Sequence, residues 1–353
     1  MATDNALVHE SPEDLALRLL QLYALPDRES PERKNAFKDL IELTRIGASP
    51  LKIVAAQQIP RFLDDFPDLE EDAINAVYDL CEDSLTEVRV EGYKAIVSVS
   101  RKNRKWGKRN VDVLVQLLQI DQESEVLVVK TALGEHLQID TRTTLSVLCD
   151  QLIVPSQEPA DEDEKSTRER LRALVLSYLV NDAKAHILDA CKQTQLSRDI
   201  VDALKPSIPN FDLQDLFTLL QKLVFFLPGY MLKDEGTTDL FSSLIEAATK
   251  HTEPPNLGST RPFLELLCSI ATTGDFVRMG SFLDFLLTVF LHENRLEAYV
   301  PEDRIYILGV FGDTLAAFRP QGHAEAKIAT WNVCPYVIEV CGRMLRLASD
   351  CHV

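Results

Sequence analysis

The sequence predicts an all-α chain built from stacked short helices, that is, an α-solenoid. Residues 51–101 show the pattern best, because they contain three amphipathic helices in a row, each with a wide apolar stripe at helical spacing. Helices this short are marginal alone and need neighbours to cover their apolar faces. Only 13 of the 353 residues are glycine, which disfavours sheet-rich architectures. These observations together favour a helical-repeat protein.

An internal repeat supports this fold class. The segment CEDSLTEV, which contains Asp83, recurs as QIDQESEV around Asp121, and each copy lies between two apolar helices. Arg89 follows the first copy, Lys52 stands one period before Arg89, and Arg168 stands in the corresponding place of a third copy. A period of about 37 to 41 residues with two helices per unit is typical of HEAT repeats. We expect the acid to cap the second helix of its unit and Arg89 to hydrogen-bond the neighbouring turn.

Ser-Pro pairs mark where the first helices begin. Ser11-Pro12, Ser30-Pro31 and Ser49-Pro50 each combine a capping hydroxyl with a proline that the first helical turn tolerates. They predict three capped helix starts. Pro60 falls inside an apolar helix, where it removes one backbone hydrogen bond and is expected to bend the helix.

The predicted helices change character after about residue 210, where they become longer and more apolar. They cover 211–226, 238–251, 261–272, 280–292, 303–318 and 333–347. We place a boundary at Lys205-Pro206, with HEAT-like repeats in 1–205 and armadillo-like repeats in 206–353. Within the first part, the prolines and acids of 155–165 predict a flexible acidic loop between helices.

The chain is strongly acidic, with a net charge of −18 and a pI near 4.8. Such a surface repels nucleic acid overall and suits basic protein partners. Seven scattered cysteines without a Cys-x-x-Cys pair indicate reduced thiols inside the cell. The N-terminus does not read as a secretory signal, and the most apolar stretch, 282–291, is too short to cross a bilayer. We expect an intracellular monomer without membrane contact.

Motifs of catalysis and metal binding are missing from the sequence. It holds no phosphate-binding glycine loop, no Gly-x-Ser-x-Gly elbow and no His-Glu-x-x-His zinc motif. The seven histidines are far apart, and none has a cysteine or a second histidine at ligand spacing. Adjacent acids such as Asp64-Asp65 splay round a helix and do not converge on one point. We therefore expect neither an enzyme nor a metal or cofactor.

One segment runs against the acidic composition. Residues 101–109, RKNRKWGKR, hold six positive charges and a tryptophan. The plainest interpretation is a solvated loop between repeats; the alternatives are a contact with nucleic acid or an acidic partner, or a nuclear import signal. The candidate contact residues are Arg101, Lys102, Arg104, Lys105, Trp106, Lys108 and Arg109.

The block from Ala55 to Asp83, AAQQIPRFLDDFPDLEEDAINAVYDLCED, closely resembles the apoptosis inhibitor 5 (anti-apoptosis clone 11) family. The family pattern there is AAQ-x-IP-x-F, then FP-x-L, AINA and DLCED, and nearly every part of it is present. The resemblance extends more loosely over 30–180, and beyond about residue 210 it rests on helical texture and apolar spacing. The sequence is therefore identified as a divergent member, for example of fungal type.

The resemblance implies a nuclear, non-enzymatic protein of HEAT-like and then armadillo-like repeats that suppresses apoptosis through protein contacts. It implies as partners a DEAD-box RNA helicase of mRNA export, an acinus-like splicing factor and basic segments such as those of growth factors. No binding residue is carried over, because the matching block reads as repeat core. Family members usually continue into a leucine-rich helix and a basic tail. We expect either that this chain, which stops at Val353, is truncated or that nuclear import relies on another signal.

Three functional hypotheses follow. The first is a nuclear adaptor whose acidic grooves bind a basic or helical segment of an RNA-processing partner. The second is a solenoid that contacts nucleic acid through 101–109. The third is a cytoplasmic transport or trafficking scaffold. Salt dependence of binding, retention of RNA and localisation of the chain distinguish the three.

Overall fold

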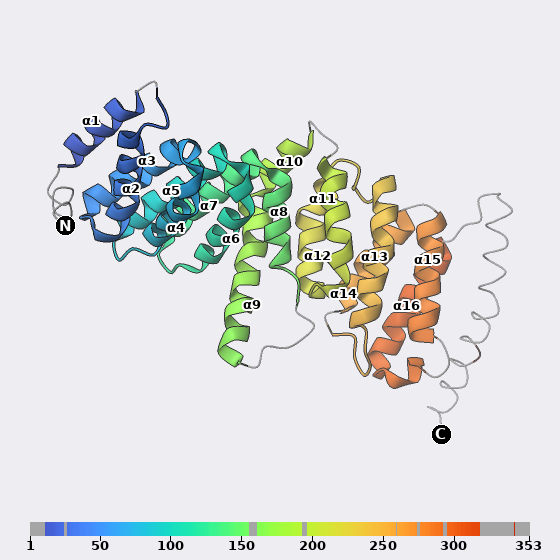
Figure 1. Cartoon of the computed structure of the whole chain (residues 1–353). Coiled ribbons are helices and arrows are strands. Elements are labelled where there is room, and N and C mark those ends of the chain that lie inside the picture. The colour runs from blue at the N-terminus through green and yellow to red at the C-terminus, as the bar shows by residue number, and fades with distance from the viewer. Residues whose placement is uncertain are drawn as a thin grey trace. The chain divides into compact units, whose positions relative to one another are not determined.

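The computed structural model describes residues 11–24, 27–154, 161–192, 196–258, 260–273, 276–291, 295–317 and 342 (Figure 1). These residues are almost entirely helical or in the turns between helices. Across the described ranges there is no β-strand, and a single isolated bridge pairs Ile153 with Phe211. The predicted all-α helical-repeat fold is confirmed.

Residues 1–151 and 159–190 form one compact unit, and residues 152–158 and 191–353 form a second. The helices that begin in the first unit are α1 Pro12–Tyr23, α2 Pro31–Ile46, α3 Ser49–Phe62, α4 Glu70–Cys81, α5 Thr86–Lys102, α6 Gly107–Gln116, α7 Glu123–Ile139, α8 Thr141–Asp150, α9 Glu162–Ser177 and α10 Lys184–Lys192. The three helices expected within 51–101 are α3, α4 and α5.

The first unit stacks its helices in two layers. Helices α3, α5 and α7 pack side by side in one layer, and the other layer contains α2 against α4 and α6 against α8. Consecutive helices pair across the layers, as α2 with α3, α4 with α5 and α6 with α7. The apolar stripe of each helix is thereby covered; Phe37, for example, is fully buried and its ring lies 6.1 Å from that of Phe62. This is the arrangement that the repeat period predicts.

Two of the three predicted serine caps are confirmed. Ser11 Oγ accepts the Asp14 N–H at 3.1 Å before α1, and Ser30 Oγ accepts the Arg33 N–H at 3.4 Å before α2. The third is wrong, because α3 begins one residue earlier: Ala48 is its N-cap and makes no side-chain hydrogen bond, so Ser49 is already helical. Pro60 does lie inside α3, two residues before the helix ends.

The prediction of a flexible acidic loop at 155–165 is wrong for its second half, and 155–160 lie outside the described residues. Asp161 caps α9 by accepting the Asp163 N–H at 3.1 Å, and the acids at 162–164 occupy the first helical turn. Negative charges there face the positive end of the helix dipole, so the acids stabilise a helix start.

A chain of hydrogen bonds runs through the core between α4, α5, α6 and α7. Tyr78 OH donates to Asn110 Oδ1 at 2.6 Å, and Asn110 Nδ2 donates to Ser100 Oγ at 2.8 Å. His136 continues it, with Nε2 2.8 Å from Ser100 Oγ and Nδ1 2.9 Å from the Ala132 carbonyl. A carbonyl only accepts, so Nδ1 carries the proton and the Ser100 hydroxyl donates to Nε2. Burial lowers the pKa of His136, which favours this neutral form.

The second unit is a further set of packed helices: α11 Leu196–Leu204, α12 Leu213–Lys222, α13 Glu235–His251, α14 Thr260–Thr273, α15 Phe276–Leu286 and α16 Pro301–Ala317. Helix α14 contacts α12, α13, α15 and α16. These helices confirm the expected ones at 211–226, 238–251, 261–272, 280–292 and 303–318 to within a few residues. The helix expected at 333–347 lies outside the described residues, and the boundary at 205/206 stays a prediction.

Candidate interaction surfaces

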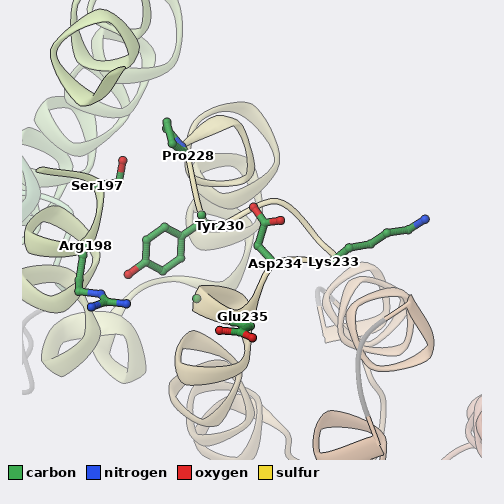
Figure 2. Close-up of a pocket in the computed structure, with 9 residues that line it drawn as sticks. Ser197, Arg198, Pro228, Tyr230, Lys233, Asp234 and Glu235 are labelled. Atoms are coloured by element: carbon green, nitrogen blue, oxygen red, sulfur yellow. The ribbon is translucent and has the colours of Figure 1, made fainter. Parts of the chain in front are cut away.

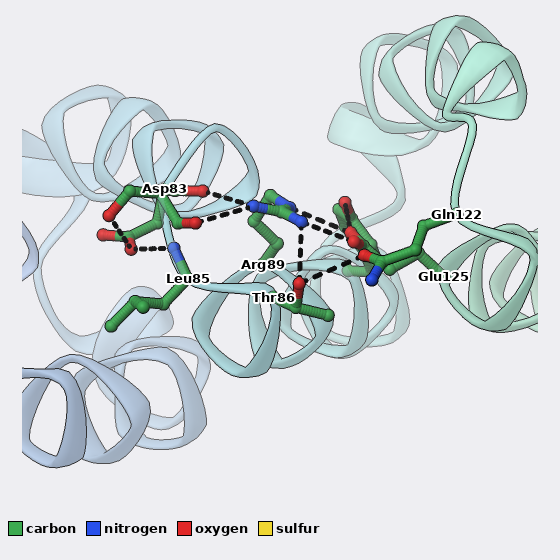
Figure 3. Close-up of polar contacts among 8 residues, drawn as sticks. Asp83, Leu85, Thr86, Arg89, Gln122 and Glu125 are labelled. Atoms are coloured by element: carbon green, nitrogen blue, oxygen red, sulfur yellow. Dashed lines mark hydrogen bonds and ion pairs between the residues drawn. The ribbon is translucent and has the colours of Figure 1, made fainter.

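The junction between the second and third helix pairs is held by Arg89 of α5 (Figure 3). Its Nη1 donates to the carbonyls of Asp83 at 2.8 Å and Ser84 at 3.2 Å, which confirms the predicted contact with the neighbouring turn. The guanidinium also pairs with Glu125 of α7, with Nε 2.9 Å from Oε2, and Tyr93 OH donates to the same oxygen at 2.9 Å. The hydrogen bonds from Arg89 and Tyr93 hold the pKa of the buried Glu125 below its usual range.

Asp83 is not itself the N-cap of α5, as the sequence predicts, but it hydrogen-bonds the residue that is. Its carboxylate accepts the Leu85 N–H at 2.9 Å, and Leu85 is the residue that caps α5 without a side-chain hydrogen bond. The same carboxylate pairs with Lys52 of the preceding repeat at 2.7 Å. Lys52 and Arg89, one period apart, therefore both reach into the following repeat.

The third copy of the motif bridges through a different residue from the one predicted. Arg168 pairs with Glu164 in its own helix α9. Arg170 reaches back instead, and its Nη2 lies 2.8 Å from Asp121 Oδ1 and 3.2 Å from the Gln119 carbonyl. Helix α9 begins at Glu162, so the side chain that faces the preceding repeat stands two residues later than the sequence register suggests.

An exposed acidic surface lies where α5 and α7 begin. Thr86 Oγ1 donates to Gln122 Oε1 at 3.2 Å, so the two helix starts are adjacent. The carboxylates there are exposed and, within the described ranges, form no ion pair, and two leucines beside them are 46% and 65% exposed. We call this surface the acidic edge; its members are Glu82, Leu85, Glu87, Glu123 and Leu127.

The basic segment 101–109 is less of a loop than the sequence suggests. Residues Arg101 and Lys102 end α5, Arg104–Trp106 form a 3₁₀ turn, and α6 begins at Gly107. Only Asn103 lies between the two helical pieces, and its side chain accepts the Lys105 N–H at 3.1 Å. The segment is therefore a tight connection between two packed helices.

Glu70, the first residue of α4, organises this connection. Its side chain is 9% exposed and accepts hydrogen bonds from Asn103 Nδ2 at 2.9 Å and Trp106 Nε1 at 2.5 Å. Lys105 forms an ion pair with it. Burial opposes ionisation, but these three donors outweigh it and lower the pKa of Glu70.

Half of the positive charge in the segment is used inside the fold. Lys105 pairs with Glu70, Arg101 pairs with Glu135, and Arg109 Nη1 lies 2.6 Å from Glu71 Oε1. In the part of the chain that the structure describes, the remaining cations are exposed and have neither an ion pair nor a hydrogen bond through their side chains. They are Lys102, Arg104 and Lys108.

The aromatic ring in the segment is also engaged. The Arg109 guanidinium lies 4.9 Å from the ring centre of Tyr78 and 5.7 Å from that of Trp106, and Lys105 Nζ lies 5.2 Å from the Trp106 ring. Trp106 is half-buried. A nucleobase needs an open aromatic face on which to stack, and these contacts occupy the ring with side chains of the chain itself.

A pocket of about 550 Å³ lies in the second unit (Figure 2). The Tyr230 hydroxyl points toward Arg198, while Lys233 extends away from the Tyr230 ring. Two cations and two carboxylates line it, namely Arg198, Lys233, Asp234 and Glu235. Both charge signs are therefore present in its lining.

No group of three metal-binding side chains occurs within the described ranges. Cys81, Cys149, Cys191 and Cys268 are free thiols, and burial raises the pKa of each, to about 12 for Cys149. Such thiols stay protonated and are poor nucleophiles. Every helix within the described part of the chain is too short or too polar to cross a membrane.

Comparison with known protein families matches residues 23–253 to the family described as Apoptosis inhibitory protein 5 (API5). The match covers well over half of the chain. The chain belongs to the apoptosis inhibitory protein 5 family. The matched range contains the acidic edge, the basic segment and the second unit as far as the end of α13.

Curated relatives within the apoptosis inhibitory protein 5 family are distant. Apoptosis inhibitor 5 of Gallus gallus is 30% identical over 162 residues, which are 46% of this chain and 30% of the relative, and the Homo sapiens protein gives the same figures. The homolog of Dictyostelium discoideum is 25% identical over 240 residues, which are 58% of this chain and 39% of the relative. The matched part thus spans less than half the length of each of these relatives.

Two solved structures also match at low similarity. Kap121p has a TM-score of 0.30 and 12% identity, with 94% of this chain and 43% of that chain covered. SYS-1 has a TM-score of 0.27 and 14% identity, with 92% and 63% covered. Scores this low support no inference about this member of the apoptosis inhibitory protein 5 family.

Sequence reasoning identified the basic segment of this family member but not the acidic edge. In the sequence, Glu82, Glu87 and Glu123 look like any of the other acids. They differ from Glu70, Glu71 and Glu125 only because the fold brings cations to the latter group and none to the former. The repeated segments CEDSLTEV and QIDQESEV were the available signal, since they place Glu82, Glu87 and Glu123 beside Glu125 at the starts of α5 and α7.

Proposed function

We propose that this member of the apoptosis inhibitory protein 5 family is a non-enzymatic nuclear scaffold that restrains apoptosis by binding other proteins. Family membership over 23–253 supports the anti-apoptotic scaffold role. The proposed partners are proteins of RNA processing: a DEAD-box RNA helicase of mRNA export and an acinus-like splicing factor. The chain acts as a monomer that binds a basic segment of each.

The acidic edge is the surface proposed for this binding. Its three carboxylates, which form no ion pair with any described residue, attract lysine and arginine side chains, and the exposed Leu85 and Leu127 offer apolar contacts to the residues between them. One exposed ion pair contributes about 0.2–1 kcal/mol, so three pairs change affinity by roughly 3- to 150-fold. Exposed charges are screened over about 10 Å at 0.1 M salt. Binding at this edge is therefore expected to weaken strongly as salt rises.

A pull-down from nuclear extract tests the proposal. Purified chain 1–353 is used with and without RNase, and the captured proteins are identified by mass spectrometry. We expect a DEAD-box helicase or an acinus-like factor that survives RNase. The triple variant Glu82→Lys, Glu87→Lys, Glu123→Lys should lose it.

A matched control distinguishes binding at the acidic edge from an effect of the overall net charge. Asp64, Asp72 and Asp112 are also exposed and, in the ranges that the structure describes, unpaired, and changing all three to Lys alters the charge by the same amount. This control should retain the partner. If both triple variants lose it equally, general electrostatic attraction explains the binding and the acidic edge does not.

The exposed cations of the basic segment favour a second candidate, contact with RNA. Lys102, Arg104 and Lys108 can be changed to Ser without touching the pairs to Glu70, Glu71 and Glu135. If RNA is bound there, this variant loses RNA in a filter-binding assay and keeps its protein partners. The third candidate, a cytoplasmic trafficking scaffold, requires that the tagged chain is found outside the nucleus by microscopy.

A further inference from the structure

A groove of about 980 Å³ in the second unit is lined mainly by apolar side chains. Helices α12 and α14 form two of its walls, and the 3₁₀ turn Val224–Phe226 and segment 231–234 complete it. Its apolar lining includes Phe217, Phe225, Met231, Leu232, Pro262 and Leu266. It is distinct from the acidic edge, which belongs to the first unit.

The lining residues of the groove follow helical spacing on both walls. Phe217 and Gln221 are one turn apart on α12, and Pro262, Leu266 and Ser269 follow one face of α14. The row on α14 runs over eight residues, from Pro262 to Ser269, and is about 10 Å long at the rise of an α-helix, which is two turns. Two neighbouring helical rows with a furrow between them are the shape against which a third helix packs.

Apolar surface in this groove is left in contact with water. Met231 is 52% exposed, and Phe217, Phe225, Leu232 and Pro262 are only half-buried. Methionine adapts its shape to different partners, and aromatic side chains contribute a large apolar area. An exposed apolar cluster of this kind on a folded unit indicates a contact surface.

Two exposed charged side chains of opposite sign line the groove, Lys233 and Glu265, and they restrict what binds there. Glu265 is exposed, and in the described part of the chain its carboxylate has only the Tyr306 hydroxyl at 3.4 Å and no ion pair. Asp234, in contrast, is committed to the fold, because it accepts the Met231 N–H at 3.0 Å. A lysine or arginine of a bound segment therefore has an unpaired carboxylate to meet at Glu265.

We propose that this groove binds an amphipathic helix of a partner protein. The helix presents apolar side chains at positions i, i+3 or i+4, and i+7 to the furrow, and a basic side chain to Glu265. The proposal goes beyond the scaffold function, because the acidic edge binds through charge and this groove binds through apolar contact. Binding here persists at high salt, where binding at the edge is lost.

A displayed library of random 16-residue peptides tests the groove. Selection is run on the full chain at about 1 M salt, where charges are screened beyond about 3 Å, with counter-selection on the Met231→Glu variant. We expect enriched peptides that share the apolar spacing and carry Lys or Arg beside it. Each should bind the wild type at least tenfold more tightly than Met231→Glu, as measured by fluorescence anisotropy of the synthesised peptide.

Two further variants make the result specific. Met231→Leu keeps the apolar surface and should bind within twofold of the wild type. At low salt, Glu265→Gln should weaken peptides that carry the basic residue by about two- to fivefold. Circular dichroism and thermal melting of Met231→Glu must match the wild type, which the exposure of Met231 favours. Failure to enrich any peptide, or equal binding to the wild type and Met231→Glu, overturns the proposal.

Two other occupants would also overturn it. If Val337→Asp with Leu345→Asp in the full chain raises peptide affinity tenfold, residues 333–347 of this chain compete for the groove. If Met231→Glu converts a dimer to a monomer in sedimentation velocity, a second copy fills it. The nuclear pull-down separates this proposal from the scaffold function, because Met231→Glu should leave the salt-sensitive partner of the acidic edge in place.

Discussion

Arg89 and Glu125 form a two-point ion pair between consecutive helical repeats, and they differ sharply in burial. The Glu125 side chain is 1% exposed and that of Arg89 is 22% exposed. Glu125 depends on Arg89 for its charge compensation, whereas Arg89 also donates to the carbonyls of Asp83 and Ser84 and reaches water. The two partners should therefore not be equivalent under mutation.

We expect Arg89→Met to lower the free energy of unfolding by about 3 kcal/mol, because it leaves a buried carboxylate without its cation. Glu125→Gln keeps a hydrogen-bond acceptor in place and should cost only about 1 kcal/mol. Urea denaturation followed by circular dichroism measures both. Equal losses in the two variants would show that burial of Glu125 does not control the energetics of the pair.

The core histidine should make stability depend on pH. Burial lowers the pKa of folded His136 below 6.5, while the unfolded chain titrates at about 6.5. Below that pH the unfolded state binds more protons, so stability is complete above about pH 6.5 and falls as the pH drops, by at most about 1.4 kcal/mol per unit. The nearby charges of Arg101 and Glu135 are paired with each other.

Urea denaturation between pH 5 and 7.5 checks this dependence on His136. His136→Gln should be less stable than the wild type at pH 7.5 and should show a flatter profile down to pH 5. A slope that persists unchanged in the variant would assign the effect to other groups.

The Glu70 cluster should report its integrity through Trp106, one of only two tryptophans in the chain. In a Trp331→Phe background, Glu70→Ala removes the acceptor of the indole N–H and of Asn103. We expect a red-shifted emission from a more solvated Trp106 and a loss of about 2–3 kcal/mol of stability. The exposed pair of Arg109 with Glu71 provides the contrast: Glu71→Ala should cost less than about 1 kcal/mol and leave the emission unchanged.

Replacing glycine by alanine should change the stability in opposite directions at two positions, Gly92 and Gly309. A Cβ at Gly92 would lie 3.0 Å from Cys81 Sγ and 3.1 Å from the Cys81 backbone nitrogen, so Gly92→Ala should force α4 and α5 apart and cost about 1–3 kcal/mol. Gly309 in α16 has open space at the same position, and Gly309→Ala should stabilise by about 0.5–1 kcal/mol. Melting temperatures that shift in the same direction would contradict this account of the α4–α5 packing.

Much of the fold follows from local pattern. Apolar spacing places α3, α4 and α5, and the repeat of Asp83 at Asp121 gives the period, because both depend on residues close in sequence. Ser49 and Arg168 show where prediction from local pattern fails. An offset of one or two residues at a helix start decides which side chain caps the helix or bridges to the next repeat, and composition does not determine this offset. Lys105 pairs with Glu70, and Glu87 has no ion-pair partner among the residues that the structure describes. Both outcomes depend on helices that meet only after stacking.

The contacts of Glu70 with Asn103, Lys105 and Trp106 fix a distance along the chain as well as in space. The three partners can contact Glu70 at the same time only if the number of residues between α4 and these partners is fixed. An insertion or deletion of even one residue in the turns between α4 and α6 would rotate the following helix and separate them. We therefore expect natural length variation in this family to fall outside the stretches of chain that such contacts hold at a fixed length.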